Sequence, residues 1–353
     1  MKKYPIAIDF DRQHVSALQL QPLKDRVGIR AIFRQPLDPG KQGDGSRDKL
    51  NLLSGLQTLK RARGFSGKRA VIHLPLDQAL CFPVEVRVKN DESLDEAILL
   101  EAGKNLPYPI EDAVIDYPSL SPTASAHHHI ATLVAAKRQE VLELLTTCRQ
   151  AGFSIDAVDF SPISLIRLHH FLFEPLEKPC IVCYVGHQQS FLQVINQDRM
   201  YAFSKFSWGK DALVDKVNQT LGLSDKVTSA VDLLQTYGIS EGADHPGDEK
   251  IARIVARILA PAIEELVFEF HKVLGYARTK ENVHDIGQVY FYGFACLIKG
   301  LDAYVEKWLN IPAVQADMGD RIESARQMAS LTPDQAAGFC PVLGLAMRKI
   351  PWL

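Results

Sequence analysis

The chain has 353 residues, enough for about two domains of ordinary size. Hydrophobic residues make up 46% and charged residues 23%, a composition typical of a globular protein with large cores. The formal net charge of −2 gives no electrostatic reason to expect nucleic acid as a partner. No stretch approaches 18 apolar residues without a charge, so we expect no membrane-spanning helix and a cytoplasmic protein.

The chain opens on three strand-like segments joined by short turns, "YPIAIDF", "HVSALQL" and "RVGIRAIFRQPL". The next segment, "DKLNLLSGLQTLKRARG", has leucines at helical spacing, a basic end and a terminal glycine. Its basic character continues through "KRARGFSGKR", residues 60–69. The ordinary interpretation of this stretch is a solvated helix end, and contact with anionic lipid headgroups is the alternative.

Residues 86–155 have a different pattern, which predicts an inserted, β-rich subdomain. Ser93 and Glu96 form a capping-box pattern ahead of an amphipathic helix. The segment "NLPYPI" ends that helix, because proline cannot donate a backbone hydrogen bond and restricts the residue before it. Two strand-like segments follow, and then a second amphipathic helix that ends at Gly152.

The opening pattern returns after residue 178. "PCIVCYVGHQQSFLQVINQDRMYAFSKFSWG" predicts strand, turn, strand, turn and strand, and "KDALVDKVNQTLG" predicts the helix that follows. A repeat at about 175 residues implies two similar domains, which we predict over residues 1–178 and 179–353. Within the second domain we expect a helical subdomain over 211–282, in which "IARIVARILAPAIEELVFEF" forms a pair of amphipathic helices.

The two repeated βββα halves resemble the actin-like (ribonuclease H-like) α/β fold, with the β-rich insert placed in the first domain. More narrowly, the chain resembles the PilM family of type IV pilus assembly proteins. The resemblance rests on "DESLDEAILLEAGKNLPYPIEDAVIDYPSL", "VGHQQSFLQVINQDRMYAFSKFSWGKDAL", "IKGLDAYVEKWLNIPAV" and "VLGLAMR". These four segments match the family in register and in order, and together they span nearly the whole chain.

This resemblance implies a partner. In the family, the cytoplasmic N-terminal tail of PilN, a single-span membrane protein, docks in a groove between the first subdomain and the insert. Leu106, Tyr108 and Ile110 lie on the irregular "NLPYPI" segment, where they could line such a groove with rigid apolar anchors. Equally, they could simply pack the insert onto its neighbour. The resemblance thus predicts a PilN-like partner and other pilus platform components, with attachment to the inner membrane through the partner.

The resemblance also implies a nucleotide site between the two halves, and this sequence departs from its motifs. The first phosphate turn of the family is D-I-G-S/T, whereas this chain has Asp9, Phe10, Asp11 and Arg12. Glycine allows backbone N–H groups to approach a phosphate closely, and aspartate replaces it here. We therefore expect Asp9 and Asp11 to cap and hydrate an ordinary hairpin turn.

The other motifs depart in the same direction. At the second turn Gly186 and Ser190 remain, but Tyr184 replaces the aspartate that faces the metal. In the family motif A-E-x-x-K, Val231 and Leu234 stand here in place of the two charged residues. In a further glycine-rich turn of the family, Gly293 remains but Phe294 replaces the next glycine. The vestigial site predicted by the resemblance comprises Asp9, Asp11, Gly186, Ser190, Gly209, Lys272 and Gly293.

These departures predict a scaffold that has no catalytic residues, binds no metal, and assembles through its partner rather than through ATP hydrolysis. No cofactor is expected, although ATP with Mg²⁺ remains an option if the site is still competent. One alternative is an active actin-like ATPase that switches partner binding with nucleotide. Another is an enzyme of the sugar-kinase branch, which would need a catalytic aspartate at the same site.

Overall fold

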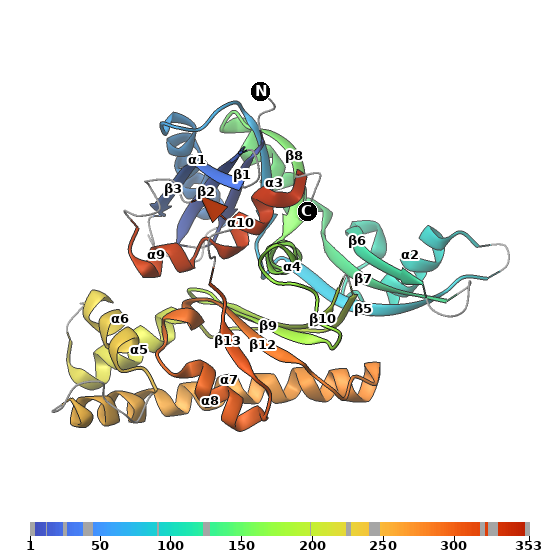
Figure 1. Ribbon diagram of the computed structural model, residues 1–353. Coiled ribbons are helices and arrows are strands. Elements are labelled where there is room, and N and C mark those ends of the chain that lie inside the picture. Colours follow the sequence, from blue (N-terminus) through green and yellow to red (C-terminus); the bar gives the residue numbers. More distant parts are fainter. Residues whose placement is uncertain are drawn as a thin grey trace. The chain divides into compact units, whose positions relative to one another are not determined.

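The computed structural model (Figure 1) describes residues 4–11, 13–23, 27–37, 45–89, 92–122, 128–197, 199–223, 227–239, 248–317, 322–323 and 331–349. Contacts divide the chain into two compact units. The first contains Met1–Glu174, Met318–Leu331 and Phe339–Leu353, and the second contains Pro175–Asp317 and Thr332–Gly338. The domain boundary predicted after residue 178 stays a prediction. Among the described helices, none has both the length and the hydropathy needed to cross a bilayer.

The first unit is built on a six-stranded sheet of β1 (Ile6–Phe10), β2 (His14–Pro22), β3 (Val27–Pro36), β4 (Arg69–Leu74), β8 (Ser154–Phe160) and β14 (Ile322–Glu323). Its order is β14-β3-β2-β1-β4-β8. The strands β1, β2 and β3 form an antiparallel meander, β4 pairs with β1 in parallel, and β8 pairs with β4 in parallel. Since β1 is central and covered on both faces, it is almost entirely apolar.

The helices of this unit are α1 (Gly45–Arg61), α3 (Arg138–Gln150), α4 (Ser161–Leu172), α10 (Cys340–Ala346) and the 3₁₀ turn η4 (Met347–Lys349). The helix α10 follows the whole second unit in the sequence, and it packs against α4, β1 and β2. All seven residues of α10 are buried. A segment distant in sequence therefore completes the core of the first unit.

The insert is a three-stranded antiparallel sheet with one helix, made of β5 (Ala79–Arg87), α2 (Leu94–Asn105), η1 (Ile110–Asp112), β6 (Ala113–Pro122) and β7 (His128–Lys137). The order β5-β7-β6 makes β5 an edge strand. Figure 1 shows α2 beside this sheet, and buried Val84, Val86, Ile98 and Leu133 form the core between them. The capping box predicted at Ser93 is confirmed, with hydrogen bonds in both directions.

The second unit repeats the connectivity of the first, with β9 (Cys180–Val185), β10 (Ser190–Asn196), β11 (Arg199–Phe206), β12 (Gln288–Gly293) and β13 (Ala313–Gln315). The order β11-β10-β9-β12-β13 again joins an antiparallel meander to two parallel strands. The internal repeat predicted from the sequence is confirmed by this topology.

The helices of the second unit are α5 (Lys210–Leu221), α6 (Val227–Thr236), α7 (Glu249–Glu281), the 3₁₀ turn η2 (Phe294–Leu297), α8 (Leu301–Leu309) and α9 (Pro333–Ala337). The prediction of a helix pair around Pro261 was wrong, because α7 continues through this residue for 33 residues. Proline costs about 3 kcal/mol inside a helix. We attribute its tolerance to the apolar face of α7, which buries eleven residues and outweighs one lost hydrogen bond.

Candidate functional site

The first turn of the predicted nucleotide site joins β1 to β2. Asp11 closes it: its Oδ1 accepts hydrogen bonds from the backbone N–H groups of Gln13 and His14, both at 2.7 Å. The backbone N–H of Asp11 in turn donates to His14 O at 3.1 Å. The capping role predicted for Asp11 is confirmed, while Arg12 lies outside the described residues.

Asp9, which we also expected to cap the turn, contacts the neighbouring strand instead. Its Oδ1 lies 2.9 Å from Nδ1 of His73 on the neighbouring strand β4, and the His73 side chain is only 1% exposed. His73 Nε2 lies 2.9 Å from the hydroxyl of Ser164 on α4. This is the carboxylate–imidazole–hydroxyl order of a hydrolytic triad. The Ser164 hydroxyl is fully buried and also contacts the carbonyl oxygens of Ser161 and Pro341, so the arrangement serves packing.

Beside this network lies a second carboxylate, which is buried. Asp159 on β8 accepts hydrogen bonds from Arg167, from Nη1 of Arg348 at 2.8 Å and from the backbone N–H of Phe160 at 2.7 Å. Burial raises the pKa of Asp159, but the positive charges of Arg167 and Arg348 and the backbone N–H of Phe160 help to hold the pKa below its usual range. Since Arg348 belongs to η4, this ion pair ties η4 to the sheet.

The second predicted turn joins β9 to β10, and its polar groups also bind one another. Ser190 is fully buried, and its hydroxyl donates to Trp208 O at 2.5 Å and accepts the N–H of Gly186 at 3.4 Å. Gly209 precedes α5, and the first N–H of that helix, from Lys210, donates to Gly186 O at 2.9 Å. The first N–H of α5 and the Ser190 hydroxyl therefore have partners within the unit.

The Tyr184 ring lies between two of the predicted glycines. A Cβ added to Gly186 would lie 3.2 Å from one edge of the ring (Cε1), and one added to Gly293 would lie 2.7 Å from the opposite edge (Cε2). Gly293, with φ of +69°, pairs with Val185 across β12 and β9. The ring also packs against Phe191, with centroids 5.2 Å apart. An aromatic ring therefore fills the place beside both glycines where the family motif has a short acidic side chain.

Two further residues here were missed by the sequence reasoning. Lys210 is buried, and its Nζ pairs with Asp334 of α9 at 2.6 Å and lies 5.9 Å from the Phe294 ring centroid. The helix α9 packs against η2, the segment that follows Gly293. A capping box at Thr332 begins α9, but no local pattern links α9 to Lys210. The pair fixes α9 against the segment that follows Gly293.

Lys272 lies apart from the other predicted residues. It stands on α7 with its side chain 52% exposed, and its Nζ pairs with Glu269 at 2.9 Å, one turn earlier in the helix. In the described part of the second unit, close contacts join Gly186, Ser190, Gly209 and Gly293 through the strand ends, and none of these contacts includes Lys272.

The three predicted partner-binding residues follow α2 in the insert. Leu106 caps α2, with its N–H donating to Ala102 O at 3.1 Å. Tyr108 is half-buried with Lys137 Nζ 5.8 Å from its ring centroid, and burial followed by the charge of Glu140 raises its pKa. Ile110 opens η1 and is 36% exposed. Each of the three therefore keeps some surface at the bend after α2.

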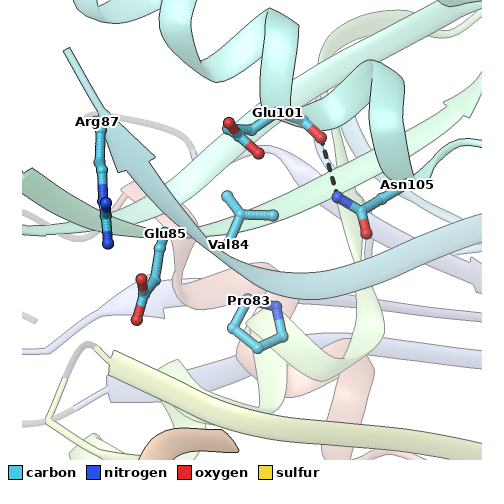
Figure 2. A pocket seen from close by; sticks show the side chains of 6 residues that line it. All are labelled: Pro83, Val84, Glu85, Arg87, Glu101 and Asn105. Atoms are coloured by element: carbon cyan, nitrogen blue, oxygen red, sulfur yellow. Dashed lines mark hydrogen bonds between the residues drawn. The ribbon is translucent and has the colours of Figure 1, made fainter.

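A hollow of about 490 Å³ lies between the edge strand β5 and α2, as Figure 2 shows. Its lining comprises Pro83, Val84, Glu85, Arg87, Glu101 and Asn105. In Figure 2, Val84 points toward α2, whereas Glu85 and Arg87 point away from that helix. Asn105 Nδ2 donates to Glu101 O at 2.9 Å, the dashed line of Figure 2, and Asn105 directly precedes Leu106. Sequence reasoning missed this hollow, because it depends on how β5 and α2 pack against each other, which the local pattern of residues does not give.

The sequence matches the family of type IV pilus assembly protein PilM over residues 7–350. The fold is similar to that of a solved PilM–PilN type IV pilus biogenesis complex, with a TM-score of 0.77, 17% identity and 98% of each chain covered. It is also similar to MreB5 of Spiroplasma citri bound to AMPPNP, with a TM-score of 0.56, 10% identity and coverage of 99% of this chain and 96% of that one.

A third similar structure is the ethanolamine utilization protein EutJ of Carboxydothermus hydrogenoformans, with a TM-score of 0.54, 12% identity and coverage of 98% and 90%. At such identities these structures speak for the fold alone, and the predicted actin-like α/β fold is confirmed. The match over almost the whole sequence decides the family. This chain belongs to the PilM family of type IV pilus assembly proteins.

Proposed function

We propose that this protein is a cytoplasmic actin-like scaffold of a type IV pilus or a related assembly platform. It binds the cytoplasmic N-terminal tail of a PilN-like inner-membrane protein and works without ATP hydrolysis. One observation carries the proposal. The polar side chains and N–H groups at the positions of the family's nucleotide motifs contact other residues of this protein. The partner keeps the protein at the inner membrane, and other platform components and self-association are compatible with this role.

The residues present do not fit Mg-ATP. Asp11 stands where the family motif has glycine, and its Oδ1 accepts the backbone N–H groups of Gln13 and His14 that would otherwise be available to a phosphate. The Tyr184 ring fills space beside Gly186 and Gly293 that phosphates would need. The alternative function, a nucleotide-driven switch, requires the side chains of Asp11 and Tyr184 to leave these positions.

The hollow beside β5 supports binding of a peptide tail. Its edge strand carries backbone groups that a further extended segment can pair with. Glu85 and Glu101 outnumber Arg87 in the lining. Cytoplasmic segments next to a membrane span are rich in Lys and Arg, so a basic tail complements this surface. Tyr108, just after the same helix, offers an aromatic anchor.

The test is the affinity of a synthetic tail peptide of the cognate PilN-like protein, measured by calorimetry with the full chain. The double variant Glu85→Gln, Glu101→Gln is expected to bind about tenfold more weakly, because two complementary charges are removed at nearly constant volume. The matched control is Glu264→Gln, Glu265→Gln on exposed positions of α7, which should bind as the unmodified protein does. Equal loss in both variants would exclude a specific role for the hollow.

Tyr108→Ala tests whether the tail also reaches the bend after α2. An aromatic anchor removed from an interface typically costs at least about 1 kcal/mol, so we expect affinity to fall by about five- to tenfold. Tyr276→Ala, which removes a 42% exposed tyrosine from α7, is the control and should leave binding unchanged. Unchanged binding by Tyr108→Ala would assign Leu106, Tyr108 and Ile110 to packing of the insert.

A further inference from the structure

Basic side chains gather at one corner of the first unit. Lys60 and Arg61 end α1, Arg63 and Lys68 lie in the loop to β4, and Arg149 ends α3. We call these five residues the basic corner, and all five are exposed.

Contacts between the three segments hold the corner together. Lys60 Nζ lies 4.9 Å from the ring centroid of Phe153, just beyond α3. The backbone N–H of Ser154 donates to Lys68 O at 2.7 Å, and that of Gly152 donates to Arg149 O at 2.9 Å. The ends of α1, α3 and the loop therefore form one surface.

The corner has almost no opposing charge. Residues 49–76 and 144–155 contain no Asp or Glu. The adjacent Asp156 pairs with Arg69, whose Nη2 is 2.7 Å from its Oδ2. Lys60 and Arg61 balance the negative end of the α1 dipole, but Arg63 and Lys68 lie beyond the helix, where the dipole gives them no role. The whole chain has a net charge of −2, so this corner is a local concentration of positive charge.

The loop that carries Arg63 and Lys68 is held in place by hydrogen bonds from β2 and β3. The Gln19 side chain is 1% exposed, and its amide donates to Ser66 O at 2.9 Å and accepts the Ser66 N–H at 2.8 Å. Arg30 Nε also donates to Gly64 O at 3.0 Å. Phe65 lies between these two anchored residues. The cationic surface is thus preorganised, which lowers the entropy cost of binding an anionic surface.

We propose that the basic corner lies against the anionic headgroups of the membrane that carries the partner, an inference that rests on the proposed function. Each Lys or Arg near an anionic bilayer favours adsorption, and a fixed cluster also orients the protein. The chemistry recognised is the phosphate of the lipid headgroups. Single-stranded nucleic acid is disfavoured as the occupant, because its binding sites usually combine a charged groove with several stacking aromatics, and this loop has Phe65 alone. A DNA duplex is compared with the vesicles in the test below.

The test is sedimentation of the full chain with vesicles of phosphatidylglycerol and phosphatidylcholine in a ratio of about 3 to 7. The unmodified protein should bind in about 0.1 M salt and be released in about 0.5 M salt. The variant Arg61→Gln, Arg63→Gln, Lys68→Gln should lose about 100-fold in vesicle affinity. The matched control is Lys216→Gln, Arg257→Gln, Lys307→Gln, which removes three exposed charges from the second unit and should bind as the unmodified protein does.

Equal loss in the two triple variants, or equal binding to vesicles of phosphatidylcholine alone, would overturn the proposal. So would tighter binding of a DNA duplex than of the anionic vesicles. Calorimetry with the partner's tail peptide on the same variants separates this inference from the proposed function. Loss of vesicle binding only in the corner variant supports the membrane contact even where the unmodified protein fails to bind the tail.

Discussion

Replacing Gly344 by alanine is expected to lower the free energy of unfolding by about 3 kcal/mol, a large effect for one added methyl group. A Cβ at this position of α10 would lie far inside van der Waals contact with Ser164 O, and 2.7 Å from the carbonyl carbon of the same residue. Both are backbone atoms of α4, so no rotamer change can relieve the overlap. The helix α10 would have to shift, and Pro341 O and Gly344 O would lose the hydrogen bonds they accept from Ser164 and Arg167.

The control for this substitution is Gly275→Ala on α7. No heavy atom lies within 4 Å of a Cβ built there, so alanine should be neutral or should stabilise the helix by up to about 1 kcal/mol. Both values come from denaturant unfolding of the full chain. A Gly344→Ala variant as stable as the unmodified protein would show that α10 does not pack on α4 as described.

Removing the carboxylate of Asp159 has the second large effect. Asp159→Ala leaves Arg167 and Arg348 facing one another in a partly buried site, and we expect a loss of about 3 kcal/mol. Asp156→Ala breaks another aspartate–arginine pair, in which Arg69 is 58% exposed, and should cost less than about 1 kcal/mol. Comparable losses in the two variants would mean that the buried network contributes no more than a surface pair.

The same carboxylate predicts a pH dependence. The folded-state pKa of Asp159 lies below its unfolded value of about 3.9, because nearby arginines favour the charged form. Its contribution to stability is therefore present above about pH 4 and is lost as pH falls through the folded-state pKa. The stability gap between the unmodified protein and Asp159→Asn should be constant near neutral pH and should narrow in acid. A gap of the same size at about pH 3 and pH 7 contradicts this assignment.

Local patterns in the sequence predicted most of the secondary structure. Alternating apolar residues and turn residues predicted the meanders β1–β3 and β9–β11. Successive side chains of a strand point to opposite faces, so a strand can be recognised from its own residues. The capping box at Ser93 marked the first turn of α2. The continuity of α7 through Pro261 was missed, since burial along a whole helix outweighs one residue's preference.

Side-chain partnerships were far less accessible to sequence reasoning. Asp9 meets His73, which lies 64 residues away, and Lys210 meets Asp334, which lies 124 residues away. Asp9 meets His73 because β1 and β4 are neighbours in the sheet. Lys210 meets Asp334 because the segment Thr332–Gly338 belongs to the second unit. The substitution by Tyr184 was evident in the sequence, but its position against Gly186 and Gly293 depends on the pairing of β9 with β12.

The most direct test of the scaffold proposal is the thermal midpoint of the purified full chain with and without millimolar Mg-ATP. A ligand at a hundred times its Kd stabilises the folded state by about 2.7 kcal/mol, which is readily seen as a shift of the midpoint. We predict no shift with Mg-ATP, together with a clear upward shift when the partner's tail peptide is added to the same sample. A clear shift with Mg-ATP alone would mean that nucleotide binds despite Tyr184 and the hydrogen bonds that Asp11 accepts, and would replace the scaffold with a nucleotide-driven switch.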